Sequence, residues 1–437
     1  MLESKSPPTE PNPLPAGDPF YNPRHRLPKT PVKVIIIGAG DRGSDYAQFA
    51  QLFPREMQIV GVAEPNTTRR EHLARIHQID PDYSFETWEQ VFARGCFADA
   101  VIIATPDALH FAPCMRAMEM GYDVLLEKPI AQTEEECLQI SAFARKTGRI
   151  VGVCHVLRYT PYFRQIKTLI AQGAIGQLIS LQHLEPIEYV HMSHSYVRGN
   201  WRDSTKTTPI VLAKSSHDFD ILSWLVGEPA ENVHCFGNLK WFRKENAPEG
   251  SRPRCTDGCT AEPECPYSAL KIYHRDHKRL HVFDLPDDSA QWSPLILQKL
   301  KTTNYGRCVY DMDNNQPDHL TVNLLYRNGV TAAFSMEAFV SYEGRRTRIM
   351  GSHGDIEGDM EHFTINSSCN GKRGTWSMKT DAHGGGDLPM VRDWLQAVAW
   401  RDPKLFSSTI DESVESHLTA FAAERSRINR TVEVVPR

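Results

Sequence analysis

Residues 32 to 40 read VKVIIIGAG, an apolar and mostly β-branched run that ends in glycines. Such a run is typical of a central parallel strand that is buried on both faces. Glycines stand at Gly38, Gly40 and Gly43, and the following SDYAQFAQLF has helical spacing. A G-x-G-x-x-G pattern between a strand and a helix predicts a tight turn whose bare backbone approaches a pyrophosphate at the helix N-terminus. The ordered part of the chain therefore opens with a predicted dinucleotide-binding unit.

The residues around this turn favour NAD over NADP. Asp41 and Arg42 lie in the glycine loop, where we expect them to contact the cofactor. A second predicted strand, Gln58 to Ala63, ends on Glu64. An acid at that strand end accepts hydrogen bonds from ribose hydroxyls and repels a 2′-phosphate. Arg69 and the neighbouring Arg70 could instead attract that phosphate, so NADP stays open as the less favoured cofactor.

Two later apolar runs end in polar residues. One is DAVIIATPDALH, which starts at Asp99, and the other is VLLEKPIA. Strands that alternate with helices predict a doubly wound parallel sheet, and ligands bind beyond the carboxyl ends of such strands. We therefore expect the nicotinamide to lie beside a set of strand-end residues, with a surface salt bridge that caps the strand as the alternative for the charged pair. The set is Thr105, Pro106, His110, Glu127 and Lys128.

Length and composition narrow the class of protein. The chain has 437 residues, more than one hydrophobic core usually supports, which indicates two domains. A formal net charge of -5 gives no electrostatic footprint for nucleic acid. The sequence contains no apolar run of about 18 residues, so no membrane span is predicted. No secretion signal is recognisable either, and we therefore expect a cytoplasmic protein. Residues 1–31 are rich in proline and predict a disordered or extended arm.

In order and spacing, GAGDRG, AEP, ATPDALH and EKPIA resemble the Gfo/Idh/MocA family of glucose-fructose oxidoreductase and inositol dehydrogenase relatives. The resemblance implies an N-terminal Rossmann domain and a C-terminal α+β domain with a large, mainly antiparallel open sheet. It also implies dimers or tetramers formed through that sheet. We further expect two C-terminal helices to pack back on the first domain. The expected domains are residues 32–152 and 153–437, and the expected helices lie near residues 390–400 and 411–427.

Family members mostly oxidise or reduce a hydroxyl of a sugar, cyclitol or related polyol with NAD(P). By resemblance, Lys128 hydrogen-bonds the reacting oxygen, and Pro129 follows a peptide bond that is often cis. His217 is the expected general base, since an imidazole titrates near neutrality; a buried structural histidine is the alternative. Many relatives have an aspartate four residues earlier, where this chain has Ala213. Lys214 follows and is expected to supply charge to the pocket or orient an acidic group of the substrate.

The segments GVCHVLRYTP and LEPIEYVHMSHSYVRGNWR are dense in polar and aromatic residues. Such density suits a carbohydrate, which needs hydrogen bonds and an apolar stacking face. The arginines leave room for an anionic sugar, and two histidines three apart could instead be metal ligands, although no third ligand is identifiable. The expected substrate-binding residues are His155, Arg158, His191, His194, Arg198, Trp201 and Arg202.

A Pro/Gly-rich insert at residues 250–310 contains four cysteines and little core-forming material. A structural metal would order such a loop, and both zinc and an iron–sulfur cluster fit the loose spacing. Free thiols or one disulfide are the alternative. The expected ligands are Cys255, Cys259 and Cys265, with Cys308 as the leading candidate for the fourth and Cys235 or a nearby histidine as alternatives.

Three functions follow from these residues. The leading hypothesis is an NAD-dependent oxidoreductase that acts on a ring hydroxyl of a sugar, glycoside or cyclitol, with a small-molecule carbohydrate or polyol as its only partner besides its own subunits. The alternative is an NAD-dependent glycosidase that oxidises C3 transiently, eliminates the aglycone and returns the hydride. Tyr159 and His383, the latter in a glycine-rich loop, would be its acid/base groups. A non-catalytic NAD-binding regulator is the third.

Overall fold

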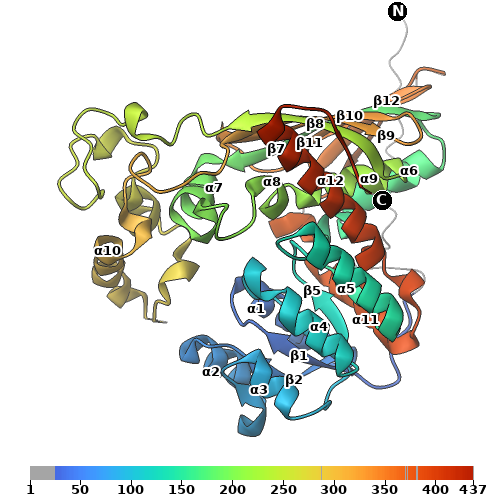
Figure 1. The fold of residues 1–437 in the computed structure, drawn as a ribbon, viewed down its shortest axis with the longest axis horizontal. Coiled ribbons are helices and arrows are strands. Elements are labelled where there is room, and N and C mark those ends of the chain that lie inside the picture. The colour runs from blue at the N-terminus through green and yellow to red at the C-terminus, as the bar shows by residue number, and fades with distance from the viewer. Residues whose placement is uncertain (1–24, 287, 370, 372, 380–381, 437) are drawn as a thin grey trace, which may run out of the picture.

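The computed structural model describes residues 25–286, 288–369, 371, 373–379 and 382–436, and within this part the side chains of residues 382 and 383 are not described. Two sheets organise the chain, one in each half of the molecule (Figure 1). Most of the predicted N-terminal arm lies outside the described residues. Its last part is tied to the first half of the molecule, because His25 Nε2 lies 2.9 Å from Glu56 Oε2 and the backbone of Arg26 is hydrogen-bonded in both directions to Gln396.

The first sheet has six parallel strands in the order β3-β2-β1-β4-β5-β6, a Rossmann-like arrangement. The apolar runs form its central strands because both faces are covered by helices, so almost every residue of β1, β4 and β5 is buried. The strands are β1 Val32–Ile37, β2 Met57–Ala63, β3 Ser84–Phe85, β4 Ala100–Ile103, β5 Asp123–Leu126 and β6 Val151–Val153. The helices between them are α1 Asp41–Leu52, α2 Thr67–Ile76, α3 Trp88–Ala93, α4 Phe111–Glu119 and α5 Glu134–Thr147.

The second sheet has nine strands in the order β14-β13-β12-β11-β7-β10-β9-β8-β15. All neighbours are antiparallel except β7 and β10. The turn between β9 and β10 contains Asn328 and Gly329, and Gly329 has φ +84°, the conformation that makes Asn-Gly a hairpin signal. The strands are β7 Leu178–Glu188, β8 Ala230–Asn238, β9 His319–Tyr326, β10 Thr331–Val340, β11 Arg346–Gly351, β12 Gly354–Gly358, β13 His362–Ser367, β14 Arg373–Ser377 and β15 Glu433–Val434.

The second half also contributes helices, some of which join its sheet to the first half while others pack on the first half or belong to the insert. They are α6 Pro161–Ala171, α7 Tyr189–Met192, α8 Ile210–Ala213, α9 Ser216–Val226, α10 Trp292–Thr302, α11 Asp387–Trp400 and α12 Ile410–Asn429. Helix α11 packs against α1 and β1, and the indole Nε1 of Trp394 donates to Val124 O at 3.2 Å. Helix α12 contacts β8 of the open sheet and α5 of the first half (Figure 1).

The cysteine-containing insert projects away from both sheets around α10 (Figure 1). It is built mainly of short turns and has a small core of its own. The core residues are Val190, Ala269, Ile272, Tyr273, Phe283, Ile296 and Leu300. So small a core stabilises an insert only weakly.

Candidate active site

The glycine turn after β1 has the geometry that a dinucleotide requires. Gly38 has φ +93°, and a Cβ there would lie 2.6 Å from Ala104 O. A Cβ on Gly43 would lie 1.9 Å from Gly38 O, so the close packing of α1 on the turn excludes a side chain. Gly40 faces open space, with Arg69 Nη1 nearest at 3.9 Å, and as N-cap of α1 it brings no side-chain acceptor. The first amides of α1, which begins at the exposed Asp41, are therefore available to pyrophosphate.

Glu64 follows β2 and lies beside this turn. Its carboxylate accepts hydrogen bonds from Ala39 N and Asn66 N, both at 2.9 Å, and so stays fixed at the mouth of the site. Arg69 does not point freely at the same place. Its guanidinium forms a two-point contact with Asp284 of the insert, at 2.8 Å and 3.0 Å, and Asn66 Nδ2 lies 3.3 Å from the same carboxylate.

The guanidinium of Arg42 is engaged by protein carboxylates, which leaves the backbone of this loop as the expected contact with the cofactor. Its guanidinium pairs with Glu127 at 2.9 Å, with Asp387 at 2.5 Å and with Asp45 at 3.0 Å. Burial acts to raise the pKa of Glu127, but the positive charges of Arg42 and Lys128 outweigh it and hold that pKa below its ordinary value. Glu127 is therefore an anion that fixes the glycine loop to the end of β5.

Lys128 lies at the meeting point of the two halves. Its peptide bond to Pro129 is cis, and its Nζ donates to Ala213 O at 2.8 Å. Burial lowers the pKa of Lys128, and the charges of Glu127 and Asp107 oppose that effect. A partly buried ammonium with one backbone acceptor keeps donor capacity for a further oxygen.

Histidines clamp the loop that carries Lys128. The ring of His110 lies between Pro129 O at 2.7 Å and Thr105 O at 2.8 Å, so His110 holds the loops that follow β4 and β5 together. This buried position corrects the expected cofactor contact of His110. From α12, His417 Nε2 accepts a hydrogen bond from Ile130 N at 3.0 Å. Thr105 donates its hydroxyl to Leu109 O at 2.9 Å.

Two cationic and two anionic side chains alternate next to Lys128. Lys214 Nζ pairs with Glu185 Oε1 at 3.0 Å, and Arg345 Nη2 pairs with Glu185 Oε2 at 2.8 Å. Arg345 Nε also lies 2.5 Å from Asp218 Oδ1, which the ring of His183 approaches to 3.1 Å. The two cations and two carboxylates balance, so Lys214 brings little net positive charge to the pocket.

Three imidazoles surround the same region. His217 stands in the first turn of α9, and its ring centroid is 5.8 Å from that of the fully buried His155. Burial, with Arg158 and Lys128 nearby, lowers the pKa of His155 well below its ordinary value. Burial and the charge of Lys214 do the same to the pKa of His191. His155 and His191 are therefore neutral at physiological pH.

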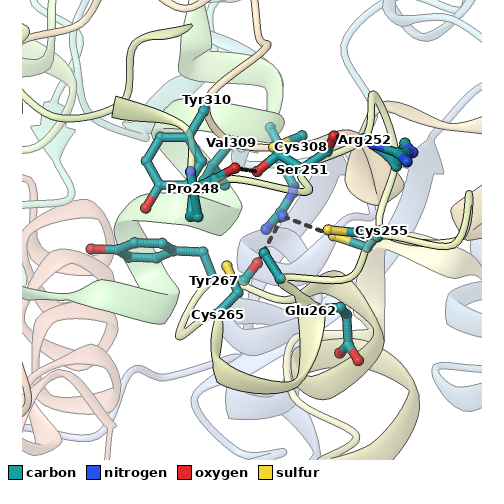
Figure 2. A pocket seen from close by; sticks show the side chains of 13 residues that line it. Pro248, Ser251, Arg252, Cys255, Glu262, Cys265, Tyr267, Cys308, Val309 and Tyr310 are labelled. Carbon is teal, nitrogen blue, oxygen red and sulfur yellow. Dashed lines mark hydrogen bonds between the residues drawn. The ribbon is translucent and has the colours of Figure 1, made fainter. Parts of the chain in front are cut away.

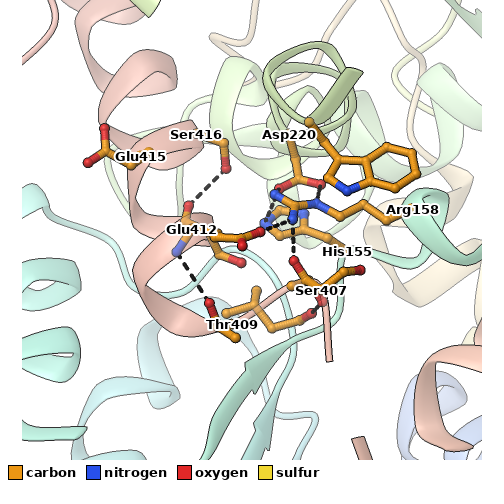
Figure 3. Close-up of polar contacts among 12 residues, drawn as sticks. His155, Arg158, Asp220, Ser407, Thr409, Glu412, Glu415 and Ser416 are labelled. Atoms are coloured by element: carbon orange, nitrogen blue, oxygen red, sulfur yellow. Dashed lines mark hydrogen bonds and ion pairs between the residues drawn. The ribbon is translucent and has the colours of Figure 1, made fainter. Parts of the chain in front are cut away.

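Arg158 and Tyr159 are structural, which corrects their expected roles in substrate binding and acid/base chemistry. Figure 3 shows Arg158 in a two-point pair with Asp220, both contacts at 2.8 Å, and also bonded to Glu412 and to Ser407 O. The Tyr159 hydroxyl accepts from the amides of Ser407 and Ser408, and it lies 3.0 Å from Ser408 Oγ. Burial raises the pKa of Tyr159 well above its ordinary value, so it neither reaches a substrate nor ionises.

Three further residues of the expected substrate set lie elsewhere. His194 stacks on Tyr305 and bonds to the Tyr273 hydroxyl at 2.9 Å inside the insert, and burial lowers its pKa to about 3. Arg198 is buried and points into the cysteine cluster, while Arg202 pairs with Asp313 at 3.1 Å. The density of polar and aromatic residues predicted these side chains on the substrate pocket, but the π-helical turn over Ser193–Arg198 directs His194 and Arg198 into the insert.

Asp107 is a site residue that the sequence prediction missed. It is buried, accepts hydrogen bonds from Trp201 Nε1 at 3.1 Å and from Thr208 Oγ1 at 2.7 Å, and its charge acts on Lys128. The signal was present, because Asp107 directly follows Thr105-Pro106 at the end of β4. Trp201, by this bond, holds the carboxylate near the ammonium.

The four cysteines of the insert line a single cavity together with Arg198 (Figure 2). All four are free thiols, and in the part of the chain that the structure describes no group of three or more His, Cys, Asp or Glu could hold a metal ion as the side chains stand. The expected closed metal site is therefore not formed in this arrangement. The side chain of His383 lies outside the described part.

Two family models match the chain. Residues 32–155 match "Oxidoreductase family, NAD-binding Rossmann fold", and residues 167–434 match "Oxidoreductase family, C-terminal alpha/beta domain". The chain belongs to the Gfo/Idh/MocA oxidoreductase family. The described helices include none that is both long enough and apolar enough to cross a membrane.

Relatives and solved structures agree with this assignment. The chain is 27% identical over 288 residues to the putative oxidoreductase YteT of Bacillus subtilis, covering 64% of this chain and 65% of that protein. It is 27% identical over 203 residues to an inositol 2-dehydrogenase of Corynebacterium glutamicum, covering 46% of this chain and 56% of that protein. The matches thus span about half to two thirds of these relatives.

A structure of levoglucosan dehydrogenase with NADH and levoglucosan has a TM-score of 0.68 at 18% identity, over 93% of this chain and all of that chain. An oxidoreductase from Agrobacterium radiobacter in complex with NAD+, L-tartaric acid and magnesium has a TM-score of 0.67 at 14% identity, over 93% of this chain and 99% of that chain. At these identities the likeness shows a shared fold.

Proposed function

We propose that this protein is an NAD-dependent oxidoreductase that acts on a ring hydroxyl of a sugar, glycoside or cyclitol. The observation that carries the proposal is the position of Lys128. It is a partly buried ammonium that follows β5, and it bonds to the backbone of Ala213, four residues before His217. The names of the relatives, inositol 2-dehydrogenase and levoglucosan dehydrogenase, support the same substrate class.

The residues assign roles within this reaction. Bound NAD+ supplies the hydride acceptor. Lys128 donates a hydrogen bond to the reacting hydroxyl oxygen and stabilises the negative charge that develops on it, as a preorganised cation does at any oxyanion. His217 accepts the hydroxyl proton, while position 213 contributes its backbone carbonyl to Lys128 and no carboxylate to the imidazole.

Glu64 and Arg69 support NAD rather than NADP. The Glu64 carboxylate is fixed by two backbone amides at the place where a 2′-phosphate would add negative charge. Of the two cations that could compensate, Arg70 donates to Glu64 O and lies 3.8 Å from Glu86. Arg69 is already held by Asp284. NADP binding would therefore have to break this ion pair.

The charge balance of the pocket favours a neutral substrate over an anionic one. Lys214 and Arg345 are matched by Glu185 and Asp218, and Arg198 and Arg202 point elsewhere. These paired side chains offer many hydrogen-bond donors and acceptors but no net charge, which suits the hydroxyl groups of a polyol.

Mixing the protein with NAD+ and a panel of sugars, glycosides and cyclitols while following NADH absorbance tests the proposal. We expect NADH to appear with neutral ring polyols and not with their acidic counterparts. Aglycone release without NADH accumulation would instead indicate the redox-neutral glycosidase, for which Tyr159 is now unavailable. Silence across the whole panel would refute both.

We also propose that the open sheet pairs subunits. Its exposed face carries Phe236 and Leu325, which are 52% and 39% exposed in the single chain. Large apolar side chains on an open sheet face are a common basis for association. Light scattering that reports only monomers would exclude this.

A further inference from the structure

Two distant segments of the insert are brought together at the cysteines. Cys255 N donates to Gly306 O at 3.0 Å and Cys308 N donates to Pro253 O at 2.9 Å, which pairs the two backbones. Cys259 and Cys265 follow in the same loop as Cys255. Figure 2 shows Cys255, Cys265 and Cys308 around the same cavity.

The sulfur atoms accept hydrogen bonds from backbone N–H groups. Ala269 N donates to Cys255 Sγ at 3.4 Å, and the amides of Tyr267 and Tyr310 donate to Cys265 and Cys308, each two residues earlier. Backbone N–H groups directed at cysteine sulfur orient the side chain, and such outer contacts are typical of metal ligands.

Arg198 adds a buried positive charge to the cavity. Only 1% of the residue is exposed, and its polar contacts are Arg307 O and Tyr267 O at 2.8 Å and Cys255 Sγ at 3.9 Å. No carboxylate of the described residues forms an ion pair with it. A buried cation without a carboxylate calls for another anion, and four thiolates around one divalent cation carry a net charge of about -2.

The size of the cavity favours a single ion over an iron–sulfur cluster. Its volume is about 10 Å³, room for about one water-sized body. An iron–sulfur cluster with its inorganic sulfides does not fit into that space, whereas a single ion does. The sulfurs are not at coordinating positions as they stand, but each can turn between staggered χ1 rotamers while its backbone stays in place.

We propose that Cys255, Cys259, Cys265 and Cys308 bind one Zn²⁺ as a structural tetrathiolate site, with Arg198 as its buried counter-charge. The ion staples an insert whose own apolar core is small. It also fixes the segment that delivers Asp284 to Arg69 beside the dinucleotide turn. This inference does not depend on the proposed reaction.

Elemental analysis of the purified full-length protein tests the site, and we expect about one zinc per chain. After chelation, Co²⁺ is added and the thiolate-to-cobalt charge-transfer and tetrahedral d–d absorption are recorded. These bands should appear with one equivalent, a readout that needs no variant and no activity. Cys308→Ser should weaken Zn²⁺ binding at least tenfold and change the cobalt spectrum.

Cys96→Ser and Cys369→Ser are matched controls, because both thiols are exposed and neither lines the cavity, so zinc content should stay unchanged. Absence of metal in the wild-type protein together with a blank cobalt titration would overturn the proposal. So would a thiol count showing that two of the four cysteines are joined in a disulfide, or equal zinc loss in the control variants.

Discussion

Asp284→Asn should relax the preference against NADP. The substitution removes the charge that holds Arg69 but keeps the volume of the side chain and an oxygen for Asn66 Nδ2. Arg69 and Asp284 are 37% and 35% exposed, so solvent screens their attraction and the pair contributes only about 0.2–1 kcal/mol. In the wild type, NADP⁺ binding is weakened by the energy needed to break this ion pair. In the variant there is no ion pair to break. Since 1.4 kcal/mol corresponds to a tenfold change, we expect its Kd to fall by about 1.4- to 5-fold.

Calorimetry with NADP⁺ and with NAD⁺ measures this effect without any assumption about the substrate. The Kd for NAD⁺ should stay within about twofold, because NAD⁺ has no 2′-phosphate for Arg69 to contact. Asp276→Asn is the control, since Asp276 pairs with Lys271 at 3.3 Å on the same insert. If Asp284→Asn left the Kd for NADP⁺ unchanged, or if the control shifted it equally, the reasoning would be refuted.

Three other predictions concern the loop after β5 and the buried ion pair. Lys128→Met should lower kcat about 10²- to 10³-fold in steady-state assays while NAD⁺ still binds, and a loss below tenfold would contradict its role at the oxyanion. The protonated form of Lys128 is the active one, so kcat/KM should fall as pH rises through a pKa that burial has lowered. Glu127→Gln removes a charge that raises this pKa, and its alkaline limb should therefore lie at lower pH than that of the wild type; a limb that stays in place or moves up would argue against the pairing. Asp220→Asn leaves the buried Arg158 with a weaker partner and should lower the free energy of unfolding in urea by about 3 kcal/mol, whereas a change below 1 kcal/mol would mean that Glu412 compensates.

The features that the sequence predicted correctly are encoded locally. A strand, a glycine turn and a helix follow one another in VKVIIIGAG and the next segment, so period and turn chemistry were sufficient to predict them. The same holds for the charged pair at the end of β5 and for the Asn-Gly hairpin between β9 and β10. In each case the residues that decide the structure lie within a few positions of one another.

The features that could not be predicted depend on partners far away in the chain. No residue near Tyr159 in the sequence indicates that its hydroxyl is hydrogen-bonded to Ser407 and Ser408, about 250 positions later. Arg158 likewise finds Asp220 and Glu412 only in the folded chain. Residue type indicates that Arg158 and Tyr159 could bind a sugar. Which partners fill their hydrogen-bonding capacity instead is set by the packing of α9 and α12.

The position of α11 has a consequence for synthesis on the ribosome. This helix comes from the far end of the chain, yet Met390 and Trp394 belong to the same apolar cluster as Val34 and Ile36 of β1. Elongation from Val153 to Asp387 takes on the order of ten to fifty seconds at ordinary rates. During that interval one face of the nascent first sheet lacks its covering helix and exposes apolar surface, so chaperones that hold nascent chains should associate with the emerging amino-terminal half until α11 has left the exit tunnel.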